Sequence, residues 1–250
     1  MATVFVHGAP NGPEIWNPLI RALNLSKPEY TNLALPGFAT PCPTGFEPGR
    51  DNYANWLIKQ FELIAADADG VGLRIVAHDF GAIFALRACS LRPQLVESWI
   101  ICGSLIDSET KPHLLAKLFR LPIIGNLVTR LMTNRRVVAK GLCKQGVPKA
   151  LAESQASGLD KDLARCILAL YQTQRASGQV HPWETDLKSL PRRGLLIWGD
   201  ADPYVSSYAA KRFAERRGVP LHVLARTGHW PFVQRPNEVA ARISEFWSAE

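Results

Sequence analysis

The sequence predicts an α/β protein: a doubly wound, mainly parallel sheet with an inserted helical lid. Three observations predict this fold class. Short apolar runs, typical of buried strands, alternate with segments of helical periodicity in the first and last parts of the 250-residue chain. Small-residue turns directly follow several of these runs. Between the two parts, residues 105–190 have a helical and basic pattern that proline and glycine interrupt.

Six strands connected by helices are expected. The strands are predicted near residues 2–6, 30–35, 73–77, 96–102, 194–198 and 221–224. Helices are predicted over 14–23, over 51–66 with Asp51 as N-cap, and over 204–217 and 238–247. A further helix is predicted directly after the turn that contains Asp79, with a helical pattern from Ile83 to Leu91 that Pro93 closes. We expect residues 1–104 and 191–250 to form the core and residues 105–190 to form a lid, or cap. In such sheets the site lies beyond the carboxyl ends of the strands.

Composition narrows the class of protein. The chain is 47% hydrophobic and 20% charged, as is typical of a globular domain in water. No apolar run approaches the ~20 residues of a membrane span, and residues 1–6 lack the basic start of a signal peptide. The five cysteines are scattered without metal-ligand spacing. We therefore expect a reduced, cytoplasmic protein with no integral membrane association, no structural metal and no cofactor.

The formal charge of +7 is concentrated in the lid. Residues 110–152 contain no Asp or Glu, whereas many Lys and Arg residues fall there. This segment is either a solvated helix surface or a region that attracts an anionic substrate or a membrane surface. A single aromatic residue, Phe119, and the absence of a recognisable motif argue against nucleic acid as a partner.

The turn after the third strand is the centre of the predicted chemistry. Asp79 stands in the middle of Ala77-His78-Asp79-Phe80-Gly81, where a buried run meets a helical pattern. Small residues let the strand and the helix pass close together, so the central side chain projects into the site. The alternative role for Asp79 is to cap the helix. His78 is expected to be a structural hydrogen-bonding residue.

Further motifs follow other predicted strands. They are His7-Gly8-Ala9-Pro10, Leu35-Pro36-Gly37-Phe38, Trp198-Gly199-Asp200-Ala201-Asp202-Pro203 and Gly228-His229. In this order, over essentially the whole chain, they resemble the oxyanion loop, nucleophile elbow, lid, acid and histidine of the α/β-hydrolase superfamily. An Asp at the elbow, in place of Ser, is similar to the branch that includes epoxide hydrolases, haloalkane and haloacid dehalogenases, and β-lactone-processing enzymes.

The resemblance implies a role for each of these residues. Asp79 would be the nucleophile, His229 the base that activates water, and Asp202 the acid that orients the histidine. The backbone N–H groups of Ala9 and Phe80 would form the oxyanion hole. The chemistry is consistent with this, because a carboxylate is ionised at neutral pH and can displace a leaving group at a saturated carbon. Activated water would then hydrolyse the resulting ester.

Other residues compete for some of these roles. Asp107, after the fourth strand, and Asp200 are alternative candidates for the acid. The other histidines are weaker candidates for the base, because His222 falls within a strand pattern, whereas His113 and His181 belong to the lid.

The residues beside the nucleophile favour an epoxide as substrate. Haloalkane dehalogenases commonly have a Trp after the nucleophile, and fluoroacetate dehalogenases an Arg, but here that residue is Phe80. Ala9 likewise has no side-chain donor for a halide. Tyr171 in the lid is expected to protonate the alkoxide, with ring packing as its alternative role. A second lid tyrosine is usual in epoxide hydrolases, but the matching residues 121–124 are apolar.

An apolar pocket is expected under the basic lid. Trp183, Trp230 and Ile124 are predicted to bind substrate, with core packing as their alternative role. Further candidates are Phe80, Ile123, Leu127, Leu131 and Phe232. Such a pocket favours a small apolar or amphiphilic electrophile.

The sequence thus predicts a cofactor-free hydrolase that converts an epoxide to a diol through a covalent aspartyl ester. Two alternatives remain. One is a dehalogenase or a β-lactone-processing enzyme with the same nucleophile. The other is a non-catalytic ligand-binding protein of the same fold.

Overall fold

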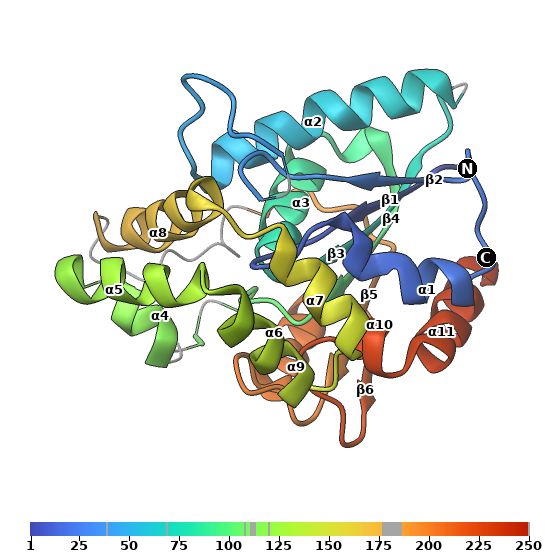
Figure 1. Ribbon diagram of the computed structural model, residues 1–250. Coiled ribbons are helices and arrows are strands. Elements are labelled where there is room, and N and C mark those ends of the chain that lie inside the picture. The colour runs from blue at the N-terminus through green and yellow to red at the C-terminus, as the bar shows by residue number, and fades with distance from the viewer. Residues whose placement is uncertain are drawn as a thin grey trace.

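A six-stranded parallel sheet forms the centre of the molecule, with strand order β2-β1-β3-β4-β5-β6 (Figure 1). The computed structural model describes residues 1–38, 40–68, 70–107, 109–110, 114–119, 121–176 and 187–249. The strands are β1 (Thr3–Val6), β2 (Tyr30–Leu33), β3 (Leu73–His78), β4 (Val96–Cys102), β5 (Gly194–Gly199) and β6 (Leu221–Leu224). The predicted fold class and all six strands are therefore confirmed.

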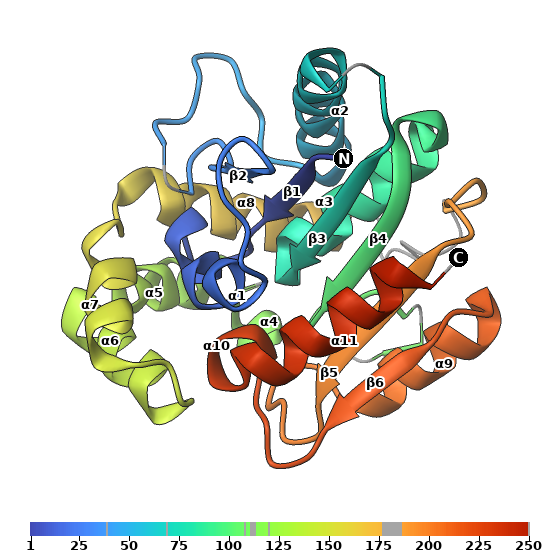
Figure 2. The ribbon, with the colours of Figure 1, turned by 90° about the vertical axis from the view of Figure 1, so that its right-hand side faces the viewer.

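Helices cover both faces of the sheet (Figure 2). One face packs against α2 (Arg50–Asp67), α3 (Asp79–Leu91) and α9 (Ser207–Arg217), and the other against α1 (Asn17–Ala22), α10 (Pro231–Gln234) and α11 (Pro236–Ser248). Short 3-10 helices occupy Pro13–Trp16 and Pro93–Leu95. Because side chains alternate along a strand, Val4 and Val6 enter the first core cluster and Phe5 enters the second. Burial on both faces explains why the four inner strands are largely apolar, whereas the edge strands β2 and β6 are only partly buried.

Among the described residues, five helices lie between β4 and β5. They are α4 (Leu114–Phe119), α5 (Pro122–Met132), α6 (Arg135–Lys144), α7 (Lys149–Ser157) and α8 (Lys161–Ala176), which we call the lid helices. Figure 1 shows them at one end of the sheet. They fall within the predicted lid, although the division into a core of 1–104 and 191–250 and a cap of 105–190 stays a prediction. In the described part of the chain, no helix is both long and apolar enough to cross a bilayer.

The start of α2 differs from the prediction that Asp51 is its N-cap. Gly49 precedes the helix with extended backbone, and no side chain caps it. Asp51 lies inside the first turn instead, where its carboxylate pairs with Arg50 at 2.9 Å and with Arg87 at 3.1 Å. The prediction that Asp51 is the N-cap was wrong, because the two arginines hold its side chain on the surface of α2 and α3.

Candidate active site

The carboxyl ends of four strands bring the predicted catalytic residues to one edge of the sheet. Asp79 follows β3 directly, and Ala9 lies just beyond β1. Asp202 and His229 lie in the loops after β5 and β6. Because every strand pair is parallel, these loops all leave the sheet on the same side.

Asp79 stands at a sharp turn between strand and helix. Its φ angle is 52°, in the left-handed region that L residues other than glycine seldom adopt. Ser104 holds the turn from the next strand end, since its Oγ donates to the backbone carbonyl of Asp79 at 2.7 Å. A Cβ at position 81 would overlap the backbone of His7, so glycine is required where the helix crosses β1. Strain of this kind is typical of functional sites.

The two oxygens of the Asp79 carboxylate have different surroundings. The N–H of Ala9 donates to Oδ1 at 2.9 Å, and the backbone N–H of Phe80 contributes to lowering the pKa of the carboxylate. Gly8 permits this approach, because a Cβ there would overlap the Asp79 side chain. Oδ2 faces His229, whose Nε2 lies 3.8 Å away. The carboxylate thus meets a backbone donor at Oδ1 and the histidine at Oδ2.

Asp202 fixes the orientation of His229. The Nδ1–H of His229 donates to Asp202 Oδ2 at 2.8 Å, which leaves Nε2 facing Asp79. The other oxygen, Asp202 Oδ1, accepts from the N–H groups of Tyr204 at 2.8 Å and Val205 at 3.0 Å. Both carboxylate oxygens of this buried acid are therefore held, and the imidazole ring cannot turn without breaking a charge-assisted bond.

The two alternative acids lie elsewhere. Asp107 is buried in an ion-pair cluster with Arg212 and Arg216 of α9 and accepts a hydrogen bond from Thr110. Asp200 accepts from the N–H of Thr227 at 3.3 Å, which braces the loop that carries His229. Neither carboxylate pairs with the histidine. Among the three candidates, the geometry favours Asp202 as the acid.

The three charges shift one another's pKa. Burial alone would lower the pKa of His229, but the charges of Asp202 and Asp79, together with the hydrogen bond to Asp202, outweigh it and raise the pKa to about 9. Burial would likewise raise the pKa of Asp79 and of Asp202, but His229 and the backbone donors outweigh it and hold both below the ordinary value. At neutral pH the site therefore holds two carboxylates and one imidazolium.

Two further histidines support the site as neutral side chains. His78 Nε2–H donates to the backbone carbonyl of His229 at 3.0 Å, and burial lowers the pKa of His78 to about 3. His7 accepts the N–H of Leu35 at 3.2 Å, and burial lowers its pKa to about 4. His78 thus ties the histidine loop to the nucleophile turn, in keeping with the structural role expected for it.

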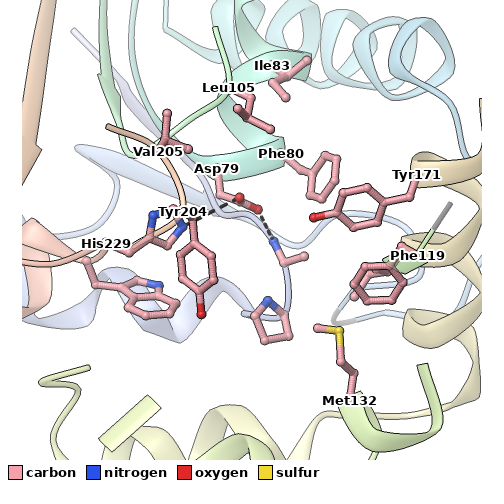
Figure 3. Close-up of a pocket in the computed structure, with 14 residues that line it drawn as sticks. Asp79, Phe80, Ile83, Leu105, Phe119, Met132, Tyr171, Tyr204, Val205 and His229 are labelled. Carbon is pink, nitrogen blue, oxygen red and sulfur yellow. Dashed lines mark hydrogen bonds and ion pairs between the residues drawn. The ribbon is translucent and has the colours of Figure 1, made fainter. Parts of the chain in front are cut away.

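A largely apolar cavity opens above Asp79, with Tyr171 on its lid side. Its lining comprises Ala9, Pro10, Asp79, Phe80, Ile83, Leu105, Phe119, Met132, Ile167, Tyr171, Tyr204, Val205, His229 and Trp230. The hydroxyl of Tyr171, from α8, points into the cavity toward Asp79 (Figure 3). Its ring stacks on Phe119 with centroids 4.6 Å apart and meets Phe80 edge-on at 5.2 Å. The Tyr171 ring therefore packs against its neighbours while its hydroxyl points into the cavity, so the two roles expected for this residue are compatible.

Tyr204 is a cavity residue that the sequence pattern did not reveal. It lies two residues after Asp202 and outside the lid, and its ring packs edge-on against His229 with centroids 4.8 Å apart. Its hydroxyl, which accepts from Gln145 Nε2 at 2.7 Å, is directed away from Asp79 (Figure 3). The sequence shows that Tyr204 lies two residues after Asp202, but no sequence pattern indicates that its hydroxyl contacts Gln145.

Only some of the predicted pocket residues line the cavity. Phe80 and Trp230 line the cavity, and the indole N–H of Trp230 donates to Asn11 Oδ1 at 2.9 Å. Ile124 is instead exposed on α5, and Ile123, Leu127 and Leu131 are exposed on the same helix. Phe232 is buried in the core, stacked on Trp16. Trp183 lies outside the described residues.

The sequence predictions also missed other lining residues, among them Phe119 and Met132. Both come from the apolar lid helices, where the pattern does not indicate which apolar residue faces inward. Within the part of the chain that the structure describes, no group of three or more His, Cys, Asp or Glu side chains is arranged to hold a metal ion.

Known structures share this fold. An epoxide hydrolase from Bacillus megaterium, solved with an inhibitor, has a TM-score of 0.74 at 18% identity, over 99% of this chain and 93% of that chain. The 2-hydroxy-6-oxo-6-phenylhexa-2,4-dienoate hydrolase from Rhodococcus sp. strain RHA1 has a TM-score of 0.76 at 20% identity, over 99% and 90%. An E-2-(acetamidomethylene)succinate hydrolase has 0.70 at 18%, over 99% and 91%.

The sequence itself also matches a family. No curated protein matches it. The sequence profile described as "Alpha/beta hydrolase family" matches residues 3–242, which is nearly the whole chain. That match includes the turn of Asp79, the lid helices, Asp202 and His229. The chain therefore belongs to the α/β-hydrolase family.

Proposed function

We propose that the protein is a hydrolase that converts an epoxide to a diol through a covalent ester on Asp79. The proposal rests on the position of the Asp79 carboxylate. Oδ1 is held by the Ala9 N–H, Oδ2 faces the His229–Asp202 pair, and the cavity lies above. A carboxylate in this position needs no base before it attacks, so the histidine is available for a later step.

In the first step, Asp79 Oδ2 attacks one epoxide carbon. A bond forms between Oδ2 and that carbon while the carbon–oxygen bond of the ring breaks, and the electron pair stays on the released oxygen. Tyr171, whose hydroxyl points toward Asp79 (Figure 3), donates its proton to this alkoxide. The imidazolium of His229 returns a proton to the tyrosine through solvent. The products are a neutral hydroxyalkyl ester and a neutral His229.

In the second step, His229 Nε2 takes a proton from water, and the water oxygen attacks Cγ of Asp79. The negative charge moves to Oδ1, where the N–H groups of Ala9 and Phe80 stabilise it. When this intermediate collapses, the Cγ–Oδ2 bond breaks and the diol leaves with Oδ2. The imidazolium of His229 donates to Oδ2 the proton that it took from water, which completes the new hydroxyl of the diol. The neutral His229 then takes up the proton of the regenerated Asp79 acid. The resting ion pair is then restored.

The charges of the site support this order of steps. In the resting state, Asp79 and Asp202 together raise the pKa of His229 to about 9, so the histidine is protonated and is not a base. Esterification makes Asp79 neutral and removes one of the two negative charges. The pKa of His229 then falls, because desolvation continues to act against the charged form. The histidine thus becomes a base only after the ester has formed.

The cavity lining supports an epoxide over a halide as the leaving group. A departing halide needs side-chain donors, and Phe80, beside the nucleophile, has none. Among the described lining residues, the indole is that of Trp230, and its N–H is already committed to Asn11. By contrast, an epoxide needs one proton for its alkoxide, and the Tyr171 hydroxyl, which points toward Asp79, would supply it.

A single turnover in H₂¹⁸O tests the proposal. The protein, in excess over a terminal aryl or alkyl epoxide, is expected to yield unlabelled diol and to gain ¹⁸O in the peptide that contains Asp79. This result follows because the diol leaves with an oxygen of Asp79 and water replaces it. Label in the diol, with none in Asp79, would mean direct attack by water. Halide release from a haloalkane or haloacid panel, with no diol from any epoxide, would contradict the substrate class.

A further inference from the structure

We propose that the outer face of α5 docks reversibly on an anionic phospholipid membrane. We use "α5 outer face" for Ile123, Ile124, Leu127 and Leu131. This inference goes beyond the proposed reaction and does not depend on it. The relevant feature is an amphipathic lid helix whose solvent side is the more apolar of its surfaces.

The α5 outer face is contiguous and exposed. Ile123 is 86% exposed and Leu127 is 59% exposed, while Ile124 and Leu131 are also exposed. With 3.6 residues per turn, these four side chains fall within an arc of about 100°. Leu114 and Leu121, from α4 and the residue before α5, are exposed nearby in the chain. Large exposed apolar patches in proteins mark interaction sites, whereas single exposed leucines do not.

The opposite side of α5 already holds the helix in place. Val128 and Thr129 are buried, and Thr129 Oγ1 donates to the carbonyl of Gly125 at 3.0 Å. Met132 reaches the cavity. Within the part of the chain that the structure describes, folding therefore leaves the α5 outer face exposed and without a packing role. Figure 1 shows α5 at the outer end of the molecule, away from the sheet.

The surrounding charge favours lipid over a second copy of the chain. Exposed basic side chains lie on α5 and on the helices before and after it: Lys117, Arg130, Arg135, Arg136, Lys140 and Lys144. Residues 110–152 contain no Asp or Glu. Pairing this face with itself would bring like charges together. An anionic bilayer instead offers apolar depth for the leucines and isoleucines and phosphate or carboxylate groups for the basic side chains.

Docking by this face would bring the cavity close to the bilayer. Phe119 at the end of α4 and Met132 at the end of α5 both line the cavity, so the same helices carry the apolar face and the cavity wall. An apolar molecule dissolved in the bilayer would then be concentrated beside the lid helices. The proposal commits to the anionic membrane surface as the occupant.

Vesicle co-sedimentation tests the proposal with the full chain. We expect the protein to bind phosphatidylcholine vesicles that contain phosphatidylserine, to bind pure phosphatidylcholine vesicles much more weakly, and to be released at high salt. Ile123→Ser combined with Leu127→Ser should lower the partition coefficient by about tenfold or more. Arg135→Gln combined with Arg136→Gln should lower it on the anionic vesicles alone.

Matched control variants test whether vesicle binding depends on the α5 outer face or on exposed leucines and basic side chains in general. Leu63→Ser removes an equally exposed leucine from α2, and Lys59→Gln with Lys211→Gln removes the same charge from helices outside the lid. These variants should bind vesicles like the parent. Equal binding by control and face variants, or no binding by the parent, would overturn the proposal. A parent dimer in light scattering that Leu127→Ser converts to a monomer, without vesicle binding, would assign the face to self-association instead.

Discussion

His229 Nε2 lies 3.8 Å from Asp79 Oδ2, which makes the two residues an ion pair across the ends of β6 and β3. The gap is longer than a hydrogen bond, and the histidine is tied more tightly to Asp202 than to Asp79. Asp79 is therefore the member of the group that is free to react. In the proposed reaction the charge of Asp79 changes from negative to neutral, and this change lowers the pKa of the nearby His229.

The ion pair predicts how stability depends on pH. The folded pKa of His229, about 9, exceeds its unfolded value near 6.5, so its contribution is complete below about pH 6.5 and is lost as pH rises through 9. The loss should be at most about 3 kcal/mol. Urea unfolding at about pH 6.5 and 9.5 should show this loss in the parent and not in His229→Gln. The same pH dependence in both proteins would rule out the raised pKa.

The acid is predicted to be Asp202, so Asp202→Asn should lower kcat by about 10²- to 10⁴-fold, because the histidine loses its fixed tautomer. Steady-state kinetics on an epoxide measures this change. Asp107→Asn is the matched control. It should leave kcat near the parent value but destabilise the fold by about 2 kcal/mol, since two arginines lose their buried partner. The reverse pattern would make Asp107 the acid.

Tyr171 is predicted to be the proton donor. Tyr171→Phe keeps the ring stack on Phe119 but removes the hydroxyl, so ester formation should slow by about 10²-fold or more. Rapid-quench measurement of the ester follows this step directly. Tyr204→Phe is the control, because the hydroxyl of Tyr204 is directed away from Asp79 (Figure 3), and it should cost less than about tenfold. Equal effects of both variants would remove the special role of Tyr171.

Ser104 is predicted to support the nucleophile turn. Ser104→Ala removes the hydrogen bond to the strained Asp79 carbonyl and should destabilise the protein by about 1 kcal/mol in urea unfolding. Ser248→Ala removes a hydroxyl of similar geometry at the exposed end of α11 and should cost less than about 0.5 kcal/mol. If the two variants are equally stable, the Ser104 bond adds nothing to the turn.

The sequence predicted those features that depend on local pattern. The four inner strands could be predicted because burial on both faces makes each of them a largely apolar run. The Asp79 turn could be predicted because small residues stand where a strand and a helix must cross. The order of Asp79, Asp202 and His229 along the parallel strands then placed them at one edge. The structure brings these three together as the pattern indicated.

Other features depend on contacts between distant segments. Ile124 and Met132 are both apolar residues of α5, yet one faces solvent and the other the cavity, because α5 is apolar on two sides. Sequence periodicity cannot distinguish an inner face from an outer one in such a helix. Asp51 has the side chain of an N-cap, but Arg87 of α3 pairs with it.

Intact mass spectrometry of His229→Gln after exposure to an epoxide tests the central claim most directly. Without the base that activates water, the first step should proceed and the ester should accumulate. We predict a mass increase equal to the whole epoxide, mapped to Asp79 and absent when Asp79→Ala is added. A parent that turns over the epoxide, while His229→Gln is inactive and gains no mass on Asp79, would contradict the covalent mechanism.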